Sequence, residues 1–378
     1  MLDILISFMS IIFIISIPVF LHELGHYLAA RSVGIKVEKF YVGMNLFGLG
    51  LKKKINETEY GIGLFPLGGY VKVAGIIDEN LDTKNNSNIK KDYEFRSKNT
   101  FQKLWFLSAG VLMNFLLSIF IFSNLFYFNG TRELVDEPII YKVQDSILVF
   151  NENNDTTSVL SPAKKLGLRT GDTILKINNN NIKTWTDISE NIISKPNSIV
   201  LVTWIDSNGI IISKEIKIEG IPSFDGSKII RKGVLGVSGY TIHKDLSIID
   251  SFILSVKETL NVIKSSFSGF KAIVSGQISL KYLSGIVGIA KEAGSIAKSS
   301  GFISLLALMA FISSNLGLIN ILPIPGLDGG HAAIAIIEGI IRREIPNKIK
   351  IGIQFIGFII IMSLFIFTIF NDIKNIIN

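Results

Sequence analysis

Cysteine is absent from this chain of 378 residues, which excludes disulfide bonds and thiolate ligands for a metal. Charge is also scarce, because only 18% of the residues are Asp, Glu, Lys or Arg, while 48% are hydrophobic. A mean hydropathy of +0.46 completes a composition typical of an integral membrane protein that also carries soluble parts. Basic loops of such a protein explain the net charge of +7, so no nucleic-acid partner is expected.

The chain contains four apolar stretches that are each long enough to cross a bilayer, at residues 4–21 continuing to about 30, 104–128, 302–324 and 351–370. The first has no basic start and no small-residue cleavage site, so we do not expect a removable signal peptide. Lys and Arg are concentrated in 35–103 and 331–350, and the positive-inside rule therefore predicts that both segments face the cytoplasm. Both termini and the long middle segment are then expected on the outer side.

The first apolar stretch ends in His22-Glu23-Leu24-Gly25-His26, an H-E-x-x-H motif. On an α-helix, residues i and i+4 share one face, so His22 and His26 can both offer a ring nitrogen to one Zn²⁺ ion. Glu23 can then act as the base that takes a proton from a water molecule at that ion. An ionisable residue inside a membrane helix costs about 2.5–3.5 kcal/mol on an insertion scale. The cluster therefore needs a partner, and Zn²⁺ is the cofactor that we expect.

A candidate third ligand follows the third apolar stretch, in the run Asn320-Ile-Leu-Pro-Ile-Pro-Gly-Leu-Asp328-Gly-Gly-His331. Its two prolines break the helix, and broken backbone at membrane depth is tolerated only where it lines protein or water. A catalytic zinc site keeps three protein ligands and one open position, so Asp328 would complete the set with the two histidines. The alternatives are that Asp328 only caps the next helix, or that His331 or Glu338 is the third ligand.

The loop after the first span contains two runs, 58–66 and 68–73, that are broken by Gly and Pro and predict the short strands of a β-hairpin. Leu64, Phe65 and Leu67 are expected to dip into the membrane edge near the zinc, and a plain surface hairpin is the alternative. In either case the loop is expected to place β-structure on the cytoplasmic side.

The middle of the chain has a different pattern. Between residues 137 and 221, short apolar runs alternate with two segments of helical character, which predicts an α+β domain. Its run S-P-A-x-x-x-G-L-x-x-G-D-x-I-L-x-I-N resembles a PDZ domain, a module that binds extended peptides by strand addition. Residues 249–300 carry apolar side chains at helical spacing, and predict amphipathic helices on the outer membrane face or a linker helix.

Together these motifs resemble the site-2 protease family of intramembrane zinc metalloproteases. H-E-L-G-H in the first span and N-I-L-P-I-P-G-L-D-G-G-H after the third carry the resemblance. The runs P-L-G-G-Y-V-K and A-G-V-L-M-N-F, with the single PDZ-like insert, are similar to the bacterial regulator of sigma-E protease branch. The resemblance implies a polytopic α-helical membrane protein with four transmembrane helices, a cytoplasmic β-rich loop and one inserted α+β PDZ-like domain.

The expected order of parts combines the apolar runs with this resemblance. It comprises a first transmembrane helix at 1–34, a cytoplasmic loop at 35–103, a second transmembrane helix at 104–128, the PDZ-like domain at 137–221, amphipathic helices at 249–300, a proline-broken third segment at 302–330, a cytoplasmic loop at 331–350 and a fourth transmembrane helix at 351–371. The resemblance further implies a bacterial cytoplasmic (inner) membrane location, with the PDZ-like domain on the outer side.

The implied activity is that of a zinc metalloendopeptidase that hydrolyses peptide bonds within transmembrane segments. Its substrates would be single-span membrane proteins in contact with the lipid bilayer, either anti-sigma-factor-like proteins already trimmed by another protease or remnants of signal peptides. Zinc would be held by His22, His26 and Asp328, with Glu23 as general base.

Three residues are expected to contact the substrate, which must unwind before its backbone can be attacked. Asn320 could hydrogen-bond that backbone, and the edge strand with Gly69 and Tyr70 could bind it as an added strand. The alternative function is a non-enzymatic membrane zinc transporter or a receptor with a peptide-binding module, since transporters also place ionisable groups in broken helices. Glu23 distinguishes the two, because transport needs ligands but no base beside a His pair.

Overall fold

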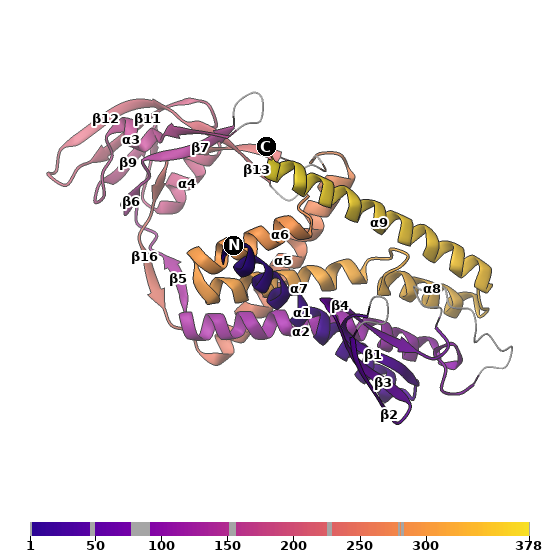
Figure 1. The fold of residues 1–378 in the computed structure, drawn as a ribbon. Coiled ribbons are helices and arrows are strands. Elements are labelled where there is room, and N and C mark those ends of the chain that lie inside the picture. The colour runs from indigo at the N-terminus through magenta and orange to yellow at the C-terminus, as the bar shows by residue number, and fades with distance from the viewer. Residues whose placement is uncertain are drawn as a thin grey trace. The chain divides into compact units, whose positions relative to one another are not determined.

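The computed structural model describes residues 2–45, 50–76, 91–150, 156–224, 229–278, 280 and 283–377. The chain forms two compact units (Figure 1). The first comprises Met1–Phe128, Ser247–Phe267 and Leu280–Asn378, and the second comprises Asn129–Leu246 and Ser268–Ser279. Each unit has its own hydrophobic core.

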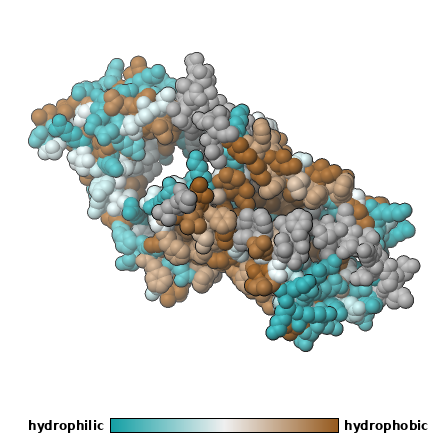
Figure 2. Space-filling model, in the orientation of Figure 1, coloured by the Kyte–Doolittle hydropathy of each residue, from teal (hydrophilic) through white to brown (hydrophobic). Residues whose placement is uncertain are grey.

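Four helices in the described part of the chain are long and apolar enough to cross a membrane: α1 (Leu2–Ser32), α2 (Thr100–Asn129), α7 (Gly301–Ile321) and α9 (Asn347–Ile377). The 21 residues of α7 span about 31 Å, close to the thickness of the hydrocarbon core of a bilayer. Figure 2 shows hydrophobic side chains gathered over the helices of the first unit and hydrophilic ones over its sheet. Each predicted span coincides with one of these helices, the third ending at Ile321, and the chain is a multi-pass membrane protein.

Helix α5 (Ile248–Val274) buries polar side chains and exposes apolar ones. Ser251, Ser255 and Thr259 repeat every four residues, so they share one face, and all three are buried. Phe252 and Ile253 lie on the exposed side. An exposed apolar face suits contact with lipid, as expected for a helix at the membrane.

Helix α6 (Ile286–Ser299) packs against α1 and α7. Ala293 belongs to the hydrophobic cluster that joins α1, α2, α6 and α7, together with Ile14 and Met309. The close approach to α1 depends on Gly294, because a Cβ atom there would lie 2.0 Å from Ser7 Oγ. The helix is therefore part of the helical core of the first unit and not a separate linker.

A four-stranded sheet follows α1 in the first unit, with the order β2-β3-β1-β4. Its strands are β1 (Val37–Met44), β2 (Gly50–Ile55), β3 (Thr58–Gly63) and β4 (Phe65–Val73). The two predicted strands exist, but they do not pair as a hairpin. They flank β1, which is parallel to β3 and antiparallel to β4, because Val37 and Tyr41 of β1 are buried and take the centre of the sheet.

The membrane-dipping prediction concerns the link between β3 and β4. Leu64 is exposed there, while the side chains of Phe65 and Leu67 lie outside the described part of the structure. Their insertion therefore stays a prediction. The sheet leads through a short 3₁₀ helix (Phe95–Ser97) into α2.

The segment 331–350, expected to be a loop, is largely helical. Helix α8 (Asp328–Ile341) begins after the proline-broken link and ends at Arg342, whose positive φ of 52° stops the helix. Glu338 of α8 helps to hold the segment that follows the helix, because its buried carboxylate pairs with Lys350 Nζ at 2.6 Å and accepts the Ile345 N–H at 2.8 Å. The charges that suggested a loop are thus partly paired.

The second unit is rich in β-structure. It contains β5 (Thr131–Leu134), β6 (Lys142–Val143), β7 (Ser146–Phe150), β8 (Thr156–Leu160), α3 (Pro162–Leu166), β9 (Thr173–Ile177), β10 (Asn180–Asn181), α4 (Trp185–Ile193), β11 (Ile199–Ile205), β12 (Ile211–Lys217), β13 (Glu219–Phe224), β14 (Ile229–Val234), β15 (Val237–Ser238) and β16 (Thr241–Lys244). A four-stranded sheet has the order β10-β9-β11-β12, and four two-stranded ladders pair β5 with β16, β6 with β15, β7 with β8 and β13 with β14.

The helices of this unit start at side-chain caps. Ser161 Oγ accepts the Lys164 N–H at 3.1 Å, and Thr184 with Asp187 forms a reciprocal capping box at the start of α4. Both helices then pack over a core that includes Trp204, which is almost fully buried. Apolar burial of this kind is typical of a water-soluble fold.

Candidate metal centre

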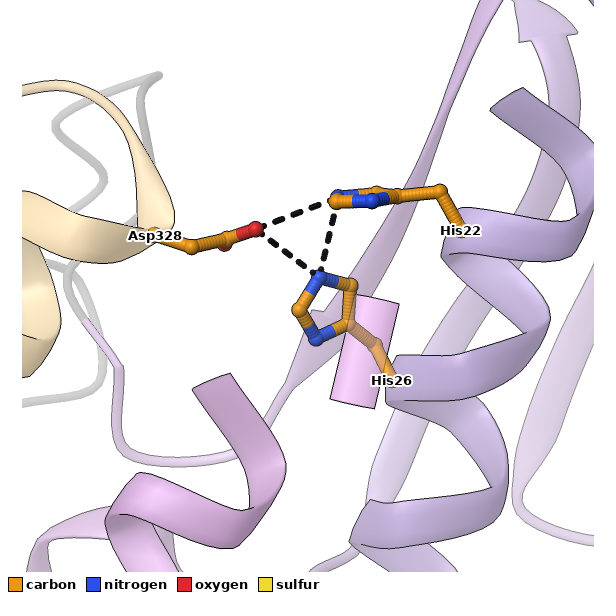
Figure 3. Close-up of side chains that lie close together, drawn as sticks. All are labelled: His22, His26 and Asp328. Atoms are coloured by element: carbon orange, nitrogen blue, oxygen red, sulfur yellow. Dashed lines mark hydrogen bonds and ion pairs between the residues drawn. The ribbon is translucent and has the colours of Figure 1, made fainter. Parts of the chain in front are cut away.

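Three potential metal ligands converge inside the first unit (Figure 3). His22 and His26 lie one turn apart on α1, and Asp328 is the first residue of α8. The Nε2 atoms of the two imidazoles are 3.1 Å apart, and Asp328 Oδ2 lies 3.1 Å from His22 Nε2 and 3.2 Å from His26 Nε2. Among the described residues this is the one group of three His, Cys, Asp or Glu side chains whose ligating atoms all lie within 4.8 Å of one another.

The dimensions of this cluster fit a zinc ion. Tetrahedral ligands at Zn–N and Zn–O distances of about 2.0–2.1 Å are separated from one another by about 3.3 Å. The three separations of 3.1–3.2 Å need only a small expansion to reach that value. Two imidazoles and one carboxylate also match the ligand sets of catalytic zinc sites, which keep a fourth position open.

Two glycines let α1 and α2 approach closely enough for the histidines to converge. A Cβ atom at Gly110 would lie 2.4 Å from His26 Nε2 and 2.7 Å from His22 Cε1. A Cβ atom at Gly25 would lie 2.5 Å from the Ala109 carbonyl oxygen. The imidazole rings therefore occupy the space that the side chain of any larger residue at position 110 would need.

Helix α2 also supplies hydrogen-bond partners to both rings. His26 Nδ1 lies 2.9 Å from the Phe106 carbonyl oxygen, so the ring donates from Nδ1 and leaves Nε2 for the cluster. His22 Nδ1 lies 3.1 Å from the carboxamide of Asn114, which is fully buried. The H-E-x-x-H motif gives Asn114 no role, although an Asn in the middle of an apolar span is a signal of a functional position.

The proline-broken link between α7 and α8 directs Asp328 toward the histidines. After Ile321 the chain turns extended, and the Gly326 N–H donates to Gln354 Oε1 at 2.7 Å on α9. Gly329 and Gly330 pack so tightly on this link that Cβ atoms would lie 2.1 Å and 2.3 Å from backbone carbonyl oxygens. The start of α8 is thus held in one place.

The alternative roles considered for Asp328, and the alternative third ligands His331 and Glu338, do not fit the structure. Leu327 occupies the N-cap position of α8, and no side chain caps the helix, so Asp328 does not act as the cap. His331 Nδ1 lies 3.4 Å from Gln354 Nε2, and Glu338 forms its ion pairs with Lys350 and Lys103. Neither residue joins the cluster of three.

Glu23 lies beside the edge strand β4. A Cβ atom at Gly69 would lie 3.1 Å from Glu23 Cγ and 3.5 Å from Val19 Cγ1, so the strand runs against the turn of α1 that carries the predicted base. The next residue, Tyr70, stacks on Tyr41 with ring centroids 5.0 Å apart. Asn320 lies on the last turn of α7 and is half-buried.

Tyr41 anchors this part of the sheet. Its ring fills the space that a side chain at Gly61 would need, since a Cβ atom there would lie 2.2 Å from Tyr41 Cε1. Its hydroxyl donates to Glu59 Oε1 at 2.6 Å. Burial, with the hydrogen bond to Glu59 second, raises the pKa of Tyr41 to about 12, so the phenol stays neutral and its hydroxyl ties β1 to Glu59 of β3.

Comparison with known proteins agrees with this geometry. The sequence model of peptidase family M50 matches residues 10–364. The chain is 33% identical to a Campylobacter jejuni protein over 98% of this chain and 94% of the relative, and 34% identical to a Clostridium acetobutylicum protein over 98% and 99%, each named as an inferred zinc metalloprotease. It is 28% identical to the zinc metalloprotease RasP of Geobacillus kaustophilus over 99% of both chains.

The match covers both halves of the cluster, because His22, His26 and Asp328 all fall inside the matched range. It also favours an enzyme over the transporter or receptor that the sequence left open. The chain therefore belongs to peptidase family M50, the site-2 protease family, and is a zinc metalloprotease.

Proposed function

We propose that the protein cleaves peptide bonds inside the bilayer, within transmembrane segments of single-span membrane proteins. One observation carries the proposal: the ligand cluster joins the membrane-length helix α1 to the start of α8, just after the membrane-length helix α7, and Glu23 beside it faces an edge strand. A peptidase centre placed among membrane helices acts most directly on a substrate that is itself in the membrane.

The proposed division of work follows the geometry. His22, His26 and Asp328 hold zinc, which when bound supplies a Lewis acid that polarises a peptide carbonyl and lowers the pKa of a water molecule. Glu23 takes the proton of the attacking water and passes it to the leaving amine nitrogen. Asn320, on the last turn of α7, hydrogen-bonds the substrate backbone.

The substrate segment is proposed to bind along β4. In the order β2-β3-β1-β4 one edge of β4 pairs with β1, while the other edge is at the border of the sheet. An unwound segment could add there as a further strand. Gly69 lets β4 come close to Glu23, and Tyr70 stacks on Tyr41 of the neighbouring strand β1.

The second unit is proposed to contain the PDZ-like domain at 137–221 and to control which substrates reach the site. An apolar pocket of about 240 Å³ lined by Ile139, Tyr141, Gly171 and Tyr240 supports peptide binding at this unit. By the charge rule, the segments 35–103 and 331–350 face the cytoplasm of a bacterial inner membrane, with both termini and this unit outside. Substrates that another protease has already trimmed, and remnants of signal peptides, would then reach the metal centre, while untrimmed proteins would not.

Glu23→Gln tests the proposal. The variant keeps all three ligands, so the purified protein should bind zinc as the wild type does, while cleavage of a reconstituted single-span substrate should be lost. Zinc content and the appearance of cut substrate are measured on the same preparation. Near-normal cleavage by Glu23→Gln would remove this residue from the mechanism, and cleavage only of soluble peptides by the wild type would remove the membrane substrate.

A further inference from the structure

We propose that Asn114 is a positioning residue for His22, and that its side-chain oxygen accepts the Nδ1–H of this imidazole. The inference rests on the proposed role of His22 as a zinc ligand. It concerns the orientation and the tautomer of the ring, which neither the family membership nor the H-E-x-x-H motif specifies.

The surroundings of Asn114 hold it against His22. The residue lies in the middle of α2, is fully buried, and has its carboxamide 3.1 Å from His22 Nδ1. Its backbone carbonyl accepts a hydrogen bond from Ser313 Oγ of α7 at 2.8 Å. As the amide is placed, Nδ2 faces the ring, and Oδ1 is one of the few buried polar atoms of the described residues without a hydrogen-bond partner.

Zinc ligation requires the opposite orientation of this amide. His22 points Nε2 toward Asp328 and His26, so Nε2 must offer its lone pair to the metal. The single proton of the neutral ring then lies on Nδ1 and needs an acceptor. A rotation of the amide by 180° exchanges its nitrogen and oxygen without moving other atoms, and places Oδ1 where it can accept that proton.

Helix α2 thus serves both imidazoles from one face. Phe106, Gly110 and Asn114 are spaced four residues apart, so they form a single stripe along the helix. Phe106 provides a backbone acceptor for His26, Gly110 provides room for both rings, and Asn114 provides a side-chain acceptor for His22. Of these two acceptors, only the side chain of Asn114 can be removed by substitution.

Two substitutions at this position separate an acceptor from a donor. Asn114→Leu has a similar size and no polar atom, whereas Asn114→Asp keeps the acceptor oxygens and loses the amide donor. Zinc affinity is measured by chelator competition on the full-length protein in detergent, and the absorption spectrum of the cobalt-substituted protein reports the ligand geometry. We expect about 10- to 100-fold weaker zinc binding and an altered cobalt spectrum for Asn114→Leu. Asn114→Asp should bind zinc at least as tightly as the wild type.

Controls distinguish this role from a loss of packing. Ser118→Ala removes a buried hydroxyl one turn further along α2 and should leave the zinc affinity unchanged. If Asn114→Leu does not fold, Asn114→Ala makes the same comparison without added bulk. Wild-type affinity in the folded apolar variant, or an equal loss in Asn114→Asp, would overturn the inference. Retention of zinc by His22→Ala would instead overturn the ligand assignment on which it rests.

Discussion

The two units of this protein each have an apolar core, but they differ in the polar groups that their interiors bury and in the apolar side chains that they expose. In the second unit the core is apolar, with Ile174, Val202 and Trp204 almost fully buried. In the first unit, helix interfaces bury polar groups such as Ser118, whose Oγ lies 2.7 Å from Ser314 Oγ, while the long apolar side chains of α9 are exposed. The distribution of polar and apolar side chains therefore suits water in the second unit and lipid in the first.

This difference shows what holds each unit together. In water, removal of apolar surface drives folding and favours large apolar side chains inside. In lipid, apolar surface gains nothing from leaving the solvent, so helices associate through close packing of small residues and through hydrogen bonds. The cluster of His22, His26 and Asp328 is one of the polar groups buried between segments of the first unit, where the ionisable side chains partner one another.

The largest expected effect is at the metal centre itself. Asp328→Ala removes one of three proposed ligands, so the protein should lose most of its zinc and its cleavage rate should fall by more than about 100-fold, the upper end for residues that only hydrogen-bond a ligand. His331→Ala, three residues further along α8, should keep its zinc. Metal analysis of both purified variants measures this, and reversed losses would make His331 the ligand.

Trp204→Ala and Ser118→Ala compare the two interiors directly. Removing the indole from the apolar core of the second unit should cost about 3–5 kcal/mol of local stability. Removing the Ser118 hydroxyl, which bonds to Ser314 and to the Ala310 carbonyl, should cost only about 0.6 kcal/mol, the average for hydrogen bonds between membrane helices. Hydrogen exchange of amides in β9 and β11 reports the first change, and of amides in α2 the second. Equal costs would remove the distinction between the units.

Gly110→Ala and Gly352→Ala test close packing within the first unit. A Cβ atom at Gly110 would meet the imidazoles, so this variant should lose about 1–3 kcal/mol of stability and bind zinc more weakly. Gly352 lies in α9, and a Cβ atom there would meet nothing within 4 Å, so its replacement should stabilise the helix by up to about 1 kcal/mol. Thermal unfolding in detergent measures both. A destabilised Gly352→Ala would indicate a contact of α9 that the structure lacks.

Much of the architecture could be predicted because its signals are local. Long apolar runs identified the four spans, and the spacing of His22 and His26 identified a shared helix face. Asp328 lies in a distant second piece of sequence, and the prolines that break the helix before it indicated that this piece lines the site.

The missed features depend on contacts between segments. The buried Tyr41 belongs to β1, which lies between β3 and β4 although these two strands follow each other in sequence, so the predicted pairing of β3 with β4 was wrong. Similarly, the run A-G-V-L-M-N-F contains Gly110 and Asn114, but their roles beside the imidazoles arise only when α2 packs on α1.

The smallest expected effect concerns the surface of the second unit. Asp187 accepts hydrogen bonds from the backbone N–H groups of Lys183 and Thr184, and these bonds lower the pKa of its carboxyl below the ordinary value. A lowered pKa means that the folded protein favours the ionised form. The stability contributed by this cap is therefore complete above the ordinary Asp pKa of about 3.9 and is lost as the pH falls through the folded value.

Asp187→Asn isolates this contribution and shows how the second unit depends on water-facing charge. The amide oxygen still accepts a hydrogen bond but carries no charge, so the variant should be slightly less stable than the wild type at neutral pH, and the gap should close as the solution becomes acidic. Hydrogen exchange of α4 amides at a series of pH values follows the difference. Because Asp187 is at the surface, added salt should shrink the gap at neutral pH as well. A gap that stayed constant with both pH and salt would mean that the charge of Asp187 contributes nothing to the stability of α4.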